Sequence, residues 1–274
     1  MTDRSSGVLD RATDSTTFER AARAGYVVSG ILHLLIAYII VRIASGSGGN
    51  ADQSGALGTI AGTTGGKVVL WIAVAAFVAM ALWRLAETLL GPHPSESGPG
   101  GEGDSQDATA FDRLKAFSLA VVYVGFAIAA AQFAMGSGKS SGEQNAGLSA
   151  RMMESGFGKF ILIVVGLVII GVGAYHVYKG ATKNFLDDLR RSHGTVIEPL
   201  GVVGYVAKGL VLVGTGILVI VAVFTSDPAK ASGIDAAVKT LSDAPFGKIL
   251  LFLAALGIAA YGCYSLVMAR HARM

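Results

Sequence analysis

The chain has 274 residues, of which 52% are hydrophobic and only 15% are charged, and its formal net charge is +3. An ordinary soluble domain carries roughly 25% charged residues, so this composition excludes one. The mean hydropathy of +0.57 arises from long apolar blocks flanked by basic residues. That distribution is typical of a multi-pass membrane protein and does not indicate a nucleic-acid partner. The single cysteine, Cys263, excludes a disulfide framework.

Six apolar blocks are each long enough to cross a bilayer, which requires about 20 residues in a helix. They lie at about 24–44, 67–90, 114–135, 158–180, 202–224 and 247–269. We therefore predict an all-α integral membrane protein with six transmembrane helices. The first block is too long for the apolar core of a secretory signal, and we expect it to remain in the mature protein.

The segments between the blocks are short and polar. We predict a cytoplasmic tail at 1–20, a flexible linker at 93–110 and a basic cytoplasmic linker at 183–200. The segments 45–66, 136–157 and 225–246 start polar and become amphipathic, with Ile234, Val238 and Leu241 at helical spacing in the last of them. No segment is long enough for a soluble catalytic domain, so any chemistry is expected within the membrane or at its edge.

The six predicted helices fall into three copies of one unit, at 21–92, 111–182 and 201–274. Gly25-Tyr26 in the first copy matches Gly204-Tyr205 in the third, and a Gly-Lys pair opens every second helix (Gly66-Lys67, Gly158-Lys159, Gly247-Lys248). Seventeen residues after each lysine, a polar residue follows an aromatic one: Trp83-Arg84, Tyr175-His176 and Tyr264-Ser265.

This spacing predicts the two edges of the membrane. A helix of that length spans ~25 Å, close to the thickness of the hydrocarbon core. We therefore expect one set of residues, Lys67, Lys159 and Lys248, to mark the outer interface, and a second set, Trp83, Tyr175 and Tyr264, to mark the inner one.

Each copy is expected to start and end in the cytoplasm. Arginine and lysine are more frequent in the N-terminal tail, in 84–115, in 179–191 and at the C-terminus than in the remaining loops, and basic residues accumulate on the cytoplasmic side. Three parallel two-helix repeats predict a six-helix bundle with pseudo-threefold symmetry. Mitochondrial carriers share this plan, but their Pro-x-Asp/Glu-x-x-Lys/Arg signature is absent from the sequence.

Several short motifs also resemble those of a known family. They are Arg23-Ala24-Gly25-Tyr26, Gly55-Ala56-Leu57, Leu82-Trp83-Arg84-Leu85-Ala86-Glu87, Ala244-Pro245-Phe246-Gly247-Lys248 and Tyr261-Gly262-Cys263-Tyr264-Ser265. The pattern resembles the bacterial membrane proteins grouped as "domain of unknown function 1206", over about 18–274. The resemblance implies three two-helix units in a bacterial plasma membrane, and it implies no activity. The second copy departs most, because Phe117-Ser118 stands where the other copies have Gly-Tyr.

Five polar residues inside the predicted spans are candidate functional residues, because an ionisable group in a bilayer is costly. His33 could relay protons or bind a metal, or it could be a neutral histidine bonded to a neighbouring helix. Arg84 and Glu87 are neighbours on one helix face and form either the inner gate of a cavity or a local interfacial pair. His176 lies near the inner edge. Lys208 has no acidic residue within its predicted span and suits an anionic ligand or lipid headgroup, unless it reaches back to the surface.

Three functions compete on these observations. The first is a non-enzymatic scaffold or accessory subunit that binds membrane proteins or lipids. The alternative is a transporter of small solutes, protons or lipid with a central cavity on the pseudo-threefold axis. The third is bis-histidine haem ligation by His33 and His176, whose predicted depths differ by ~6 Å. No catalytic or phosphate-loop motif is recognisable, so we expect no enzyme activity, no cofactor and no metal site.

Overall fold

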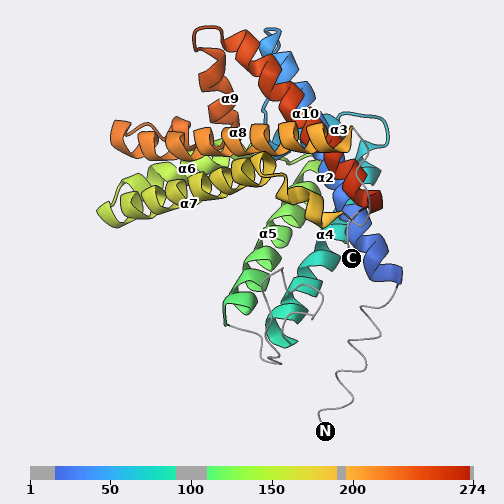
Figure 1. Cartoon of the computed structure of the whole chain (residues 1–274). Coiled ribbons are helices and arrows are strands. Elements are labelled where there is room, and N and C mark those ends of the chain that lie inside the picture. The colour runs from blue at the N-terminus through green and yellow to red at the C-terminus, as the bar shows by residue number, and fades with distance from the viewer. Residues whose placement is uncertain (1–15, 91–109, 190–195, 272–274) are drawn as a thin grey trace. The chain divides into compact units, whose positions relative to one another are not determined.

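The computed structural model describes residues 16–90, 110–189 and 196–271, and within each copy a short helix lies between two long ones (Figure 1). The long helices are α2 (Thr16–Ala44), α4 (Gly66–Leu90), α5 (Ala110–Ala134), α7 (Gly156–Ala181), α8 (Ile197–Thr225) and α10 (Gly247–His271). The short elements are α3 (Gln53–Ala61), α6 (Ser141–Met153), α9 (Ile234–Ser242) and the 3-10 turns η2 (Asn184–Asp188) and η3 (Pro228–Ala231). All six long helices are long and apolar enough to cross a membrane, which confirms the predicted six-span helical fold.

Two helices begin earlier than predicted. α2 starts at Thr16 and α8 at Ile197, because a helix can continue into polar sequence once its backbone hydrogen bonds are established. Part of the predicted linker at 183–200 is therefore ordered as η2 and the first turn of α8. α8 consequently contains one acidic residue, Glu198, which pairs with Lys183 at 2.5 Å. The predicted tail before Thr16 and the linker at 93–109 lie outside the described residues.

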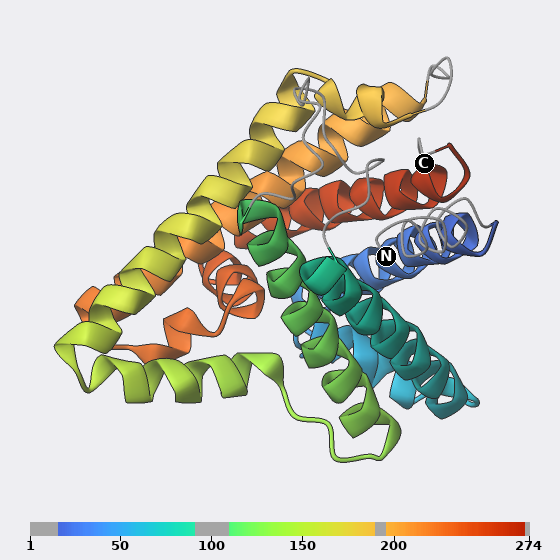
Figure 2. The ribbon, with the colours of Figure 1, turned by 90° about the horizontal axis from the view of Figure 1, so that it is seen from below.

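The chain divides into two compact units. Unit 1 comprises 1–56 and 140–274, and unit 2 comprises 57–139. In unit 1, α2 packs along α10, α7 packs along α8, and α8 also packs against α10; in unit 2, α4 packs along α5 (Figure 2). The pairs α4–α5, α7–α8 and α10–α2 each combine the second helix of one copy with the first helix of another. The pseudo-threefold arrangement of the copies stays a prediction.

The α7–α8 pair is held by glycines that let the two backbones touch. A Cβ atom placed on Gly173 would lie 2.7 Å from the carbonyl oxygen of Gly209, and one on Gly209 would lie 2.6 Å from that of Gly173. Gly166 and Gly216 repeat this contact farther along the pair, at 2.9 and 2.6 Å. Close backbone approach replaces the hydrophobic drive that is missing between helices in lipid.

The α2–α10 pair uses the same device. A Cβ on Gly30 would lie 2.9 Å from the carbonyl oxygen of Gly262, and one on Gly262 would lie 3.0 Å from that of Gly30. Gly171 and Gly214 lie outside these contacts, since a Cβ at either position would meet no atom of a neighbouring segment within 4 Å in the described part of the chain.

In unit 2, α4 and α5 pack without close backbone contacts between glycines. Its core contains Leu57, Leu70, Ala130 and Ala134, and the Phe77 ring of α4 contacts Phe126 of α5 at 5.5 Å between ring centroids. Alanine and aromatic side chains thus fill the interface that glycines close in unit 1. This difference agrees with the departure of the second copy from the repeat pattern.

In each Gly-Lys pair, glycine is required because a larger residue would clash with the preceding turn. A Cβ placed on Gly66, Gly158 or Gly247 would lie 1.7, 2.0 or 2.4 Å from the carbonyl oxygen of Ile60, Met152 or Leu241, respectively. The chain turns so sharply between each short helix and the following long helix that only glycine fits at the first position of the long helix. The lysines follow directly, with Lys67 and Lys248 exposed and Lys159 partly exposed.

The connectors that carry the three short helices are tied together by side chains. Asp235 of α9 is 4% exposed; its Oδ1 accepts a hydrogen bond from the Ala51 amide at 2.9 Å, and its Oδ2 accepts one from Lys239 at 2.6 Å. The bond to Ala51 joins the third copy to the first. A carboxylate in such a buried place is stable because both oxygens have donors.

Two further bonds complete what we name the connector clasp. The Ser54 hydroxyl accepts a hydrogen bond from the Ser141 amide at 3.0 Å, joining the first copy to the second. Asn145 Nδ2 donates to the Ser232 carbonyl at 3.3 Å, joining the second copy to the third. The clasp therefore connects all three copies in a closed cycle at the end of unit 1 where the connectors lie.

Candidate functional site

Lys208 meets an aromatic ring in the middle of the helical part of unit 1. Its ammonium lies over the ring of Tyr261 from α10, 4.0 Å from the centroid, a distance typical of a cation–π interaction. Lys208 is only partly exposed. Within the described part of the chain it makes no ion pair with a carboxylate, so its charge is not neutralised there.

His33 of α2 contacts the same ring. The His33 and Tyr261 centroids are 4.7 Å apart, and Nδ1 of His33 lies 2.7 Å from the Ser29 carbonyl oxygen. Because a carbonyl only accepts hydrogen bonds, Nδ1 must carry the proton, and Nε2 of the neutral ring is left as an acceptor. Two candidate residues from different helices thus meet at Tyr261.

His176 of α7 extends this group. Its ring stacks on Tyr205 of α8 with centroids 5.9 Å apart, and Tyr205 contacts Tyr261 at 5.3 Å. The His176 Nδ1 lies 2.8 Å from the Val172 carbonyl, which fixes the same tautomer as in His33. We name His33, His176, Tyr205, Lys208 and Tyr261 the basic–aromatic cluster.

The cluster does not fit haem held between two histidines. Axial ligands must face each other across one iron, whereas His33 and His176 pack against different tyrosines that contact each other. The contacts His33–Tyr261, Tyr261–Tyr205 and Tyr205–His176 connect the two imidazoles through tyrosine rings. The described residues also contain no group of three or more His, Cys, Asp or Glu side chains placed to hold a metal ion.

A close helix crossing positions the cluster. A Cβ on Gly204 would lie 2.6 Å from the backbone of Tyr261, so glycine at this position lets α8 cross α10 closely enough for Tyr205 and Tyr261 to touch. Tyr205 also stacks on Phe185 of η2 at 5.3 Å. The segment after α7 therefore packs onto the cluster.

Tyr264, which was expected to mark the inner membrane interface, is buried. It is 1% exposed, and its hydroxyl donates to the Phe185 carbonyl at 3.0 Å. Its depth in the membrane stays a prediction. The η2 segment covers this part of α10, so Tyr264 lies inside unit 1. Tyr175, its counterpart in the second copy, is 58% exposed.

Arg84 and Glu87 form a separate pair in unit 2. Their side chains are 2.7 Å apart, and the Trp83 indole donates to the other Glu87 oxygen at 2.8 Å. Glu87 is 5% exposed, and both of its oxygens have donors, so it is held firmly in place. The predicted neighbour relation is present. Their role as a cavity gate stays a prediction.

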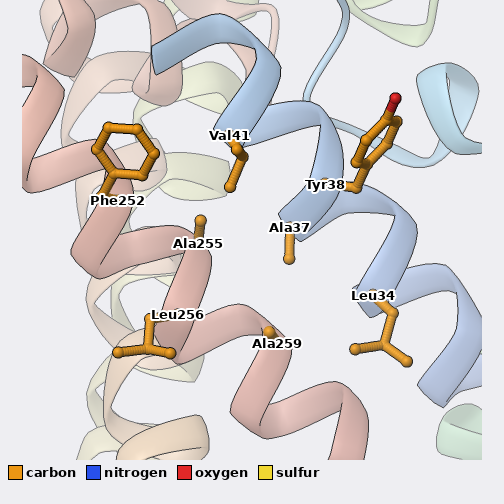
Figure 3. Close-up of a pocket in the computed structure, with 8 residues that line it drawn as sticks. All are labelled: Leu34, Ala37, Tyr38, Val41, Phe252, Ala255, Leu256 and Ala259. Atoms are coloured by element: carbon orange, nitrogen blue, oxygen red, sulfur yellow. The ribbon is translucent and has the colours of Figure 1, made fainter. Parts of the chain in front are cut away.

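An open apolar groove lies between α2 and α10 (Figure 3). Its lining residues are Leu34, Ala37, Tyr38, Val41, Phe252, Ala255, Leu256 and Ala259. Helical periodicity places Tyr261 on the opposite side of α10 from Phe252 and Ala259, so the groove is separate from the basic–aromatic cluster. Its lining suits hydrocarbon rather than a polar solute. The predicted central cavity stays a prediction.

Sequence reasoning missed two groups of residues. Tyr205 and Tyr261 appeared only inside repeat motifs, although two aromatics beside glycines in apolar helices could have suggested a close crossing. Asp235 and Ser54 had no signal of their own, because short polar residues in a loop are common and their partners lie far away in the sequence.

Comparison with known proteins gives the following. The family model described as "Domain of Unknown Function (DUF1206)" matches residues 24–91, 114–183 and 203–272. The chain is also similar to the "Uncharacterized protein YxxB" of Bacillus subtilis (strain 168), with 25% identity over 254 residues, 91% of this chain and 89% of that protein. No solved structure shows a significant match.

Proposed function

The chain belongs to the DUF1206 family, and from that premise we propose that it is a non-enzymatic accessory or scaffold protein that binds anionic lipid and other proteins of the membrane. The observation that carries the proposal is Lys208, a cation within a membrane-spanning helix that has an aromatic contact but no ion pair among the described residues. A cation near the bilayer centre costs about 2.5–3.5 kcal/mol on insertion scales. An anion bound beside it offsets that cost.

The outer faces of the helices support binding of neighbours. Only 11% of the span in α4 and 17% of the span in α7 is buried within the structure, so most of their apolar surface is available to lipid or to partner helices. A Cβ placed on Gly171 or Gly214 would meet no neighbouring segment within 4 Å in the described part of the chain, and small residues on such faces permit close helix approach. These are features of a protein that associates within the membrane.

We place the protein in a bacterial plasma membrane with both termini in the cytoplasm. The bias of arginine and lysine supports this orientation. The family resemblance supports the bacterial plasma membrane. The connector clasp then lies outside the cell, and η2 lies on the cytoplasmic side.

Transport is the second candidate. It is favoured by the meeting of His33 and Lys208, from different helices, at one ring. Flux of anions or protons in proteoliposomes distinguishes the two functions. Flux above that of empty vesicles, lost on Lys208→Met and reduced on His33→Ala, would establish transport. Flux equal to that of empty vesicles supports the accessory role.

Lipid analysis of the purified protein tests the proposal. We expect anionic phospholipid to be enriched over neutral lipid in protein extracted in mild detergent, and Lys208→Met to reduce this enrichment severalfold because the buried charge is gone. Lys230→Met is the matched control, since Lys230 lies in a connector and pairs with Asp227 at 3.5 Å. Equal lipid content in the two variants and the wild type would contradict the proposal.

A further inference from the structure

We propose that His33 and Lys208 together bind one phosphate monoester group as its monoanion. The Lys208 ammonium pairs with a charged oxygen, and Nε2 of His33 accepts the hydrogen bond of the P–OH group. This inference rests on the proposed anion-binding role of Lys208 and names the chemistry of its ligand.

The two side chains present complementary hydrogen-bonding groups. Lys208 offers only donors. His33 offers an acceptor, because its Nδ1–H is directed to the Ser29 carbonyl at 2.7 Å and Nε2 has no hydrogen-bond partner in the part of the chain that the structure describes. Both lie against the ring of Tyr261, at 4.7 Å for the His33 ring and 4.0 Å for the Lys208 ammonium. Both are partly exposed, so a ligand can reach them.

A donor and an acceptor that contact the same ring select among anions. A phosphate diester at neutral pH has only acceptor oxygens, so it satisfies Lys208 and leaves Nε2 of His33 without a partner. Protonating His33 to provide a donor would place a second positive charge near Lys208 in a medium of low dielectric constant, which is unfavourable. A monoester monoanion carries both an anionic oxygen and an O–H group, and it matches the pair without this second charge.

The same phosphate chemistry can come from a lipid headgroup or from free phosphate. Phosphatidic acid carries a phosphate monoester, and inorganic phosphate has an equivalent monoanion. Phosphatidylmethanol is the matched probe, because it is a diester of the same lipid class and its methyl headgroup carries no hydrogen-bond donor. The lipids, used as short-chain forms, are titrated into the full-length protein in detergent, and binding is followed by native mass spectrometry with inorganic phosphate as competitor.

We expect the wild type to bind phosphatidic acid about tenfold or more tightly than phosphatidylmethanol, the effect of one hydrogen bond to a charged group. His33→Leu should abolish this preference and leave phosphatidylmethanol binding nearly unchanged. His33→Gln, which keeps an acceptor, should retain much of the preference. Lys208→Met should weaken both lipids. Displacement of the lipid by inorganic phosphate identifies a free anion as the ligand, and its absence identifies the headgroup.

Two results would overturn the inference in distinguishable ways. If the wild type binds both lipids equally, or if His33→Leu retains the preference, the role of His33 is refuted while binding at Lys208 stands. If neither lipid nor phosphate binds, or if Lys208→Met changes nothing, the proposed anion-binding function fails as well. Circular dichroism and the elution profile of each variant show whether a loss of binding reflects a loss of folding.

Discussion

Single residues where the copies disagree hold most of the chemistry of this chain. Lys208 occupies the position of Ser29 in the first copy and Val121 in the second, and it is the residue that brings a charge to Tyr261. Residues on which the copies agree include glycines at helix contacts or turns, such as Gly209 and Gly247. The repeat therefore accounts for the packing, and the departures from it account for the candidate site.

Two glycines of α8 provide a matched test of the packing. Gly209→Ala puts a methyl group 2.6 Å from the Gly173 carbonyl oxygen and 2.7 Å from the Val177 amide nitrogen, and these backbone atoms cannot move independently of the helix. We expect a loss of about 1–3 kcal/mol in the free energy of unfolding. Gly214→Ala, which meets no atom within 4 Å, should stay within about 0.5 kcal/mol of the wild type. Unfolding by titration with sodium dodecyl sulfate measures both free energies. Equal effects of the two substitutions would refute the role of Gly209 in the close contact between α7 and α8.

Among the elements, the short helices connect the long helices along the chain and also bind one another. α3, α6 and α9 belong to connectors that are joined by the connector clasp, so the connectors of the three copies contact one another outside the spanning helices. We expect the buried Asp235 to contribute most to the clasp, because its carboxylate accepts hydrogen bonds from two donors. Val238 of α9 is also buried, in the same core cluster as Ile40 and Leu251. α9 thus ties α2 to α10 both by polar and by apolar contacts.

Removal of Asp235 tests the clasp. Asp235→Ala leaves the buried Ala51 amide without its acceptor, and we expect a loss of about 1–3 kcal/mol in stability. Amide hydrogen exchange should accelerate at Ala51 and in the first turn of α9. Asp243→Ala is the control, because Asp243 is exposed at the end of the same helix. Equal exchange in the two variants would show that the Asp235 bond contributes nothing to the connection.

For the whole molecule, the main feature is that each long helix pairs with a helix of another copy. Each long pair, α4–α5, α7–α8 and α10–α2, combines different copies, so one copy alone lacks the partners of its own helices. The third copy brings α8 and α10 into contact as well, and the basic–aromatic cluster forms there. The cluster requires the first copy too, because α2 supplies His33.

Cysteine labelling tests the proposed orientation. Cys263 is the sole cysteine, so Cys263→Ser gives a background for single cysteines at two exposed positions, Ser137→Cys after α5 and Thr182→Cys after α7. A membrane-impermeant maleimide applied to intact cells should label the first and not the second, because the proposed orientation puts the end of α7 in the cytoplasm. Both should react in permeabilised cells. The reverse labelling would invert the orientation.

Much of the fold follows from local properties of the sequence. The length and hydropathy of each apolar block determine six spanning helices, and the Gly-Lys and aromatic–polar spacing determines three copies, because both depend only on residues near each other in the chain. The candidates His33 and Lys208 could also be found this way, since a polar residue stands out in an apolar helix.

Which helices pair was decided only by the tertiary structure. The contact of Gly30 with Gly262, and the crossing of Gly204 over Tyr261, join residues from distant parts of the chain, and an apolar helix shows no periodicity that identifies its partner face. The same crossing brings His33 and Lys208 to one ring, and it buries Tyr264 beneath η2. The sequence by itself determined the helices and their polar exceptions; backbone approach between copies determined which of those exceptions meet.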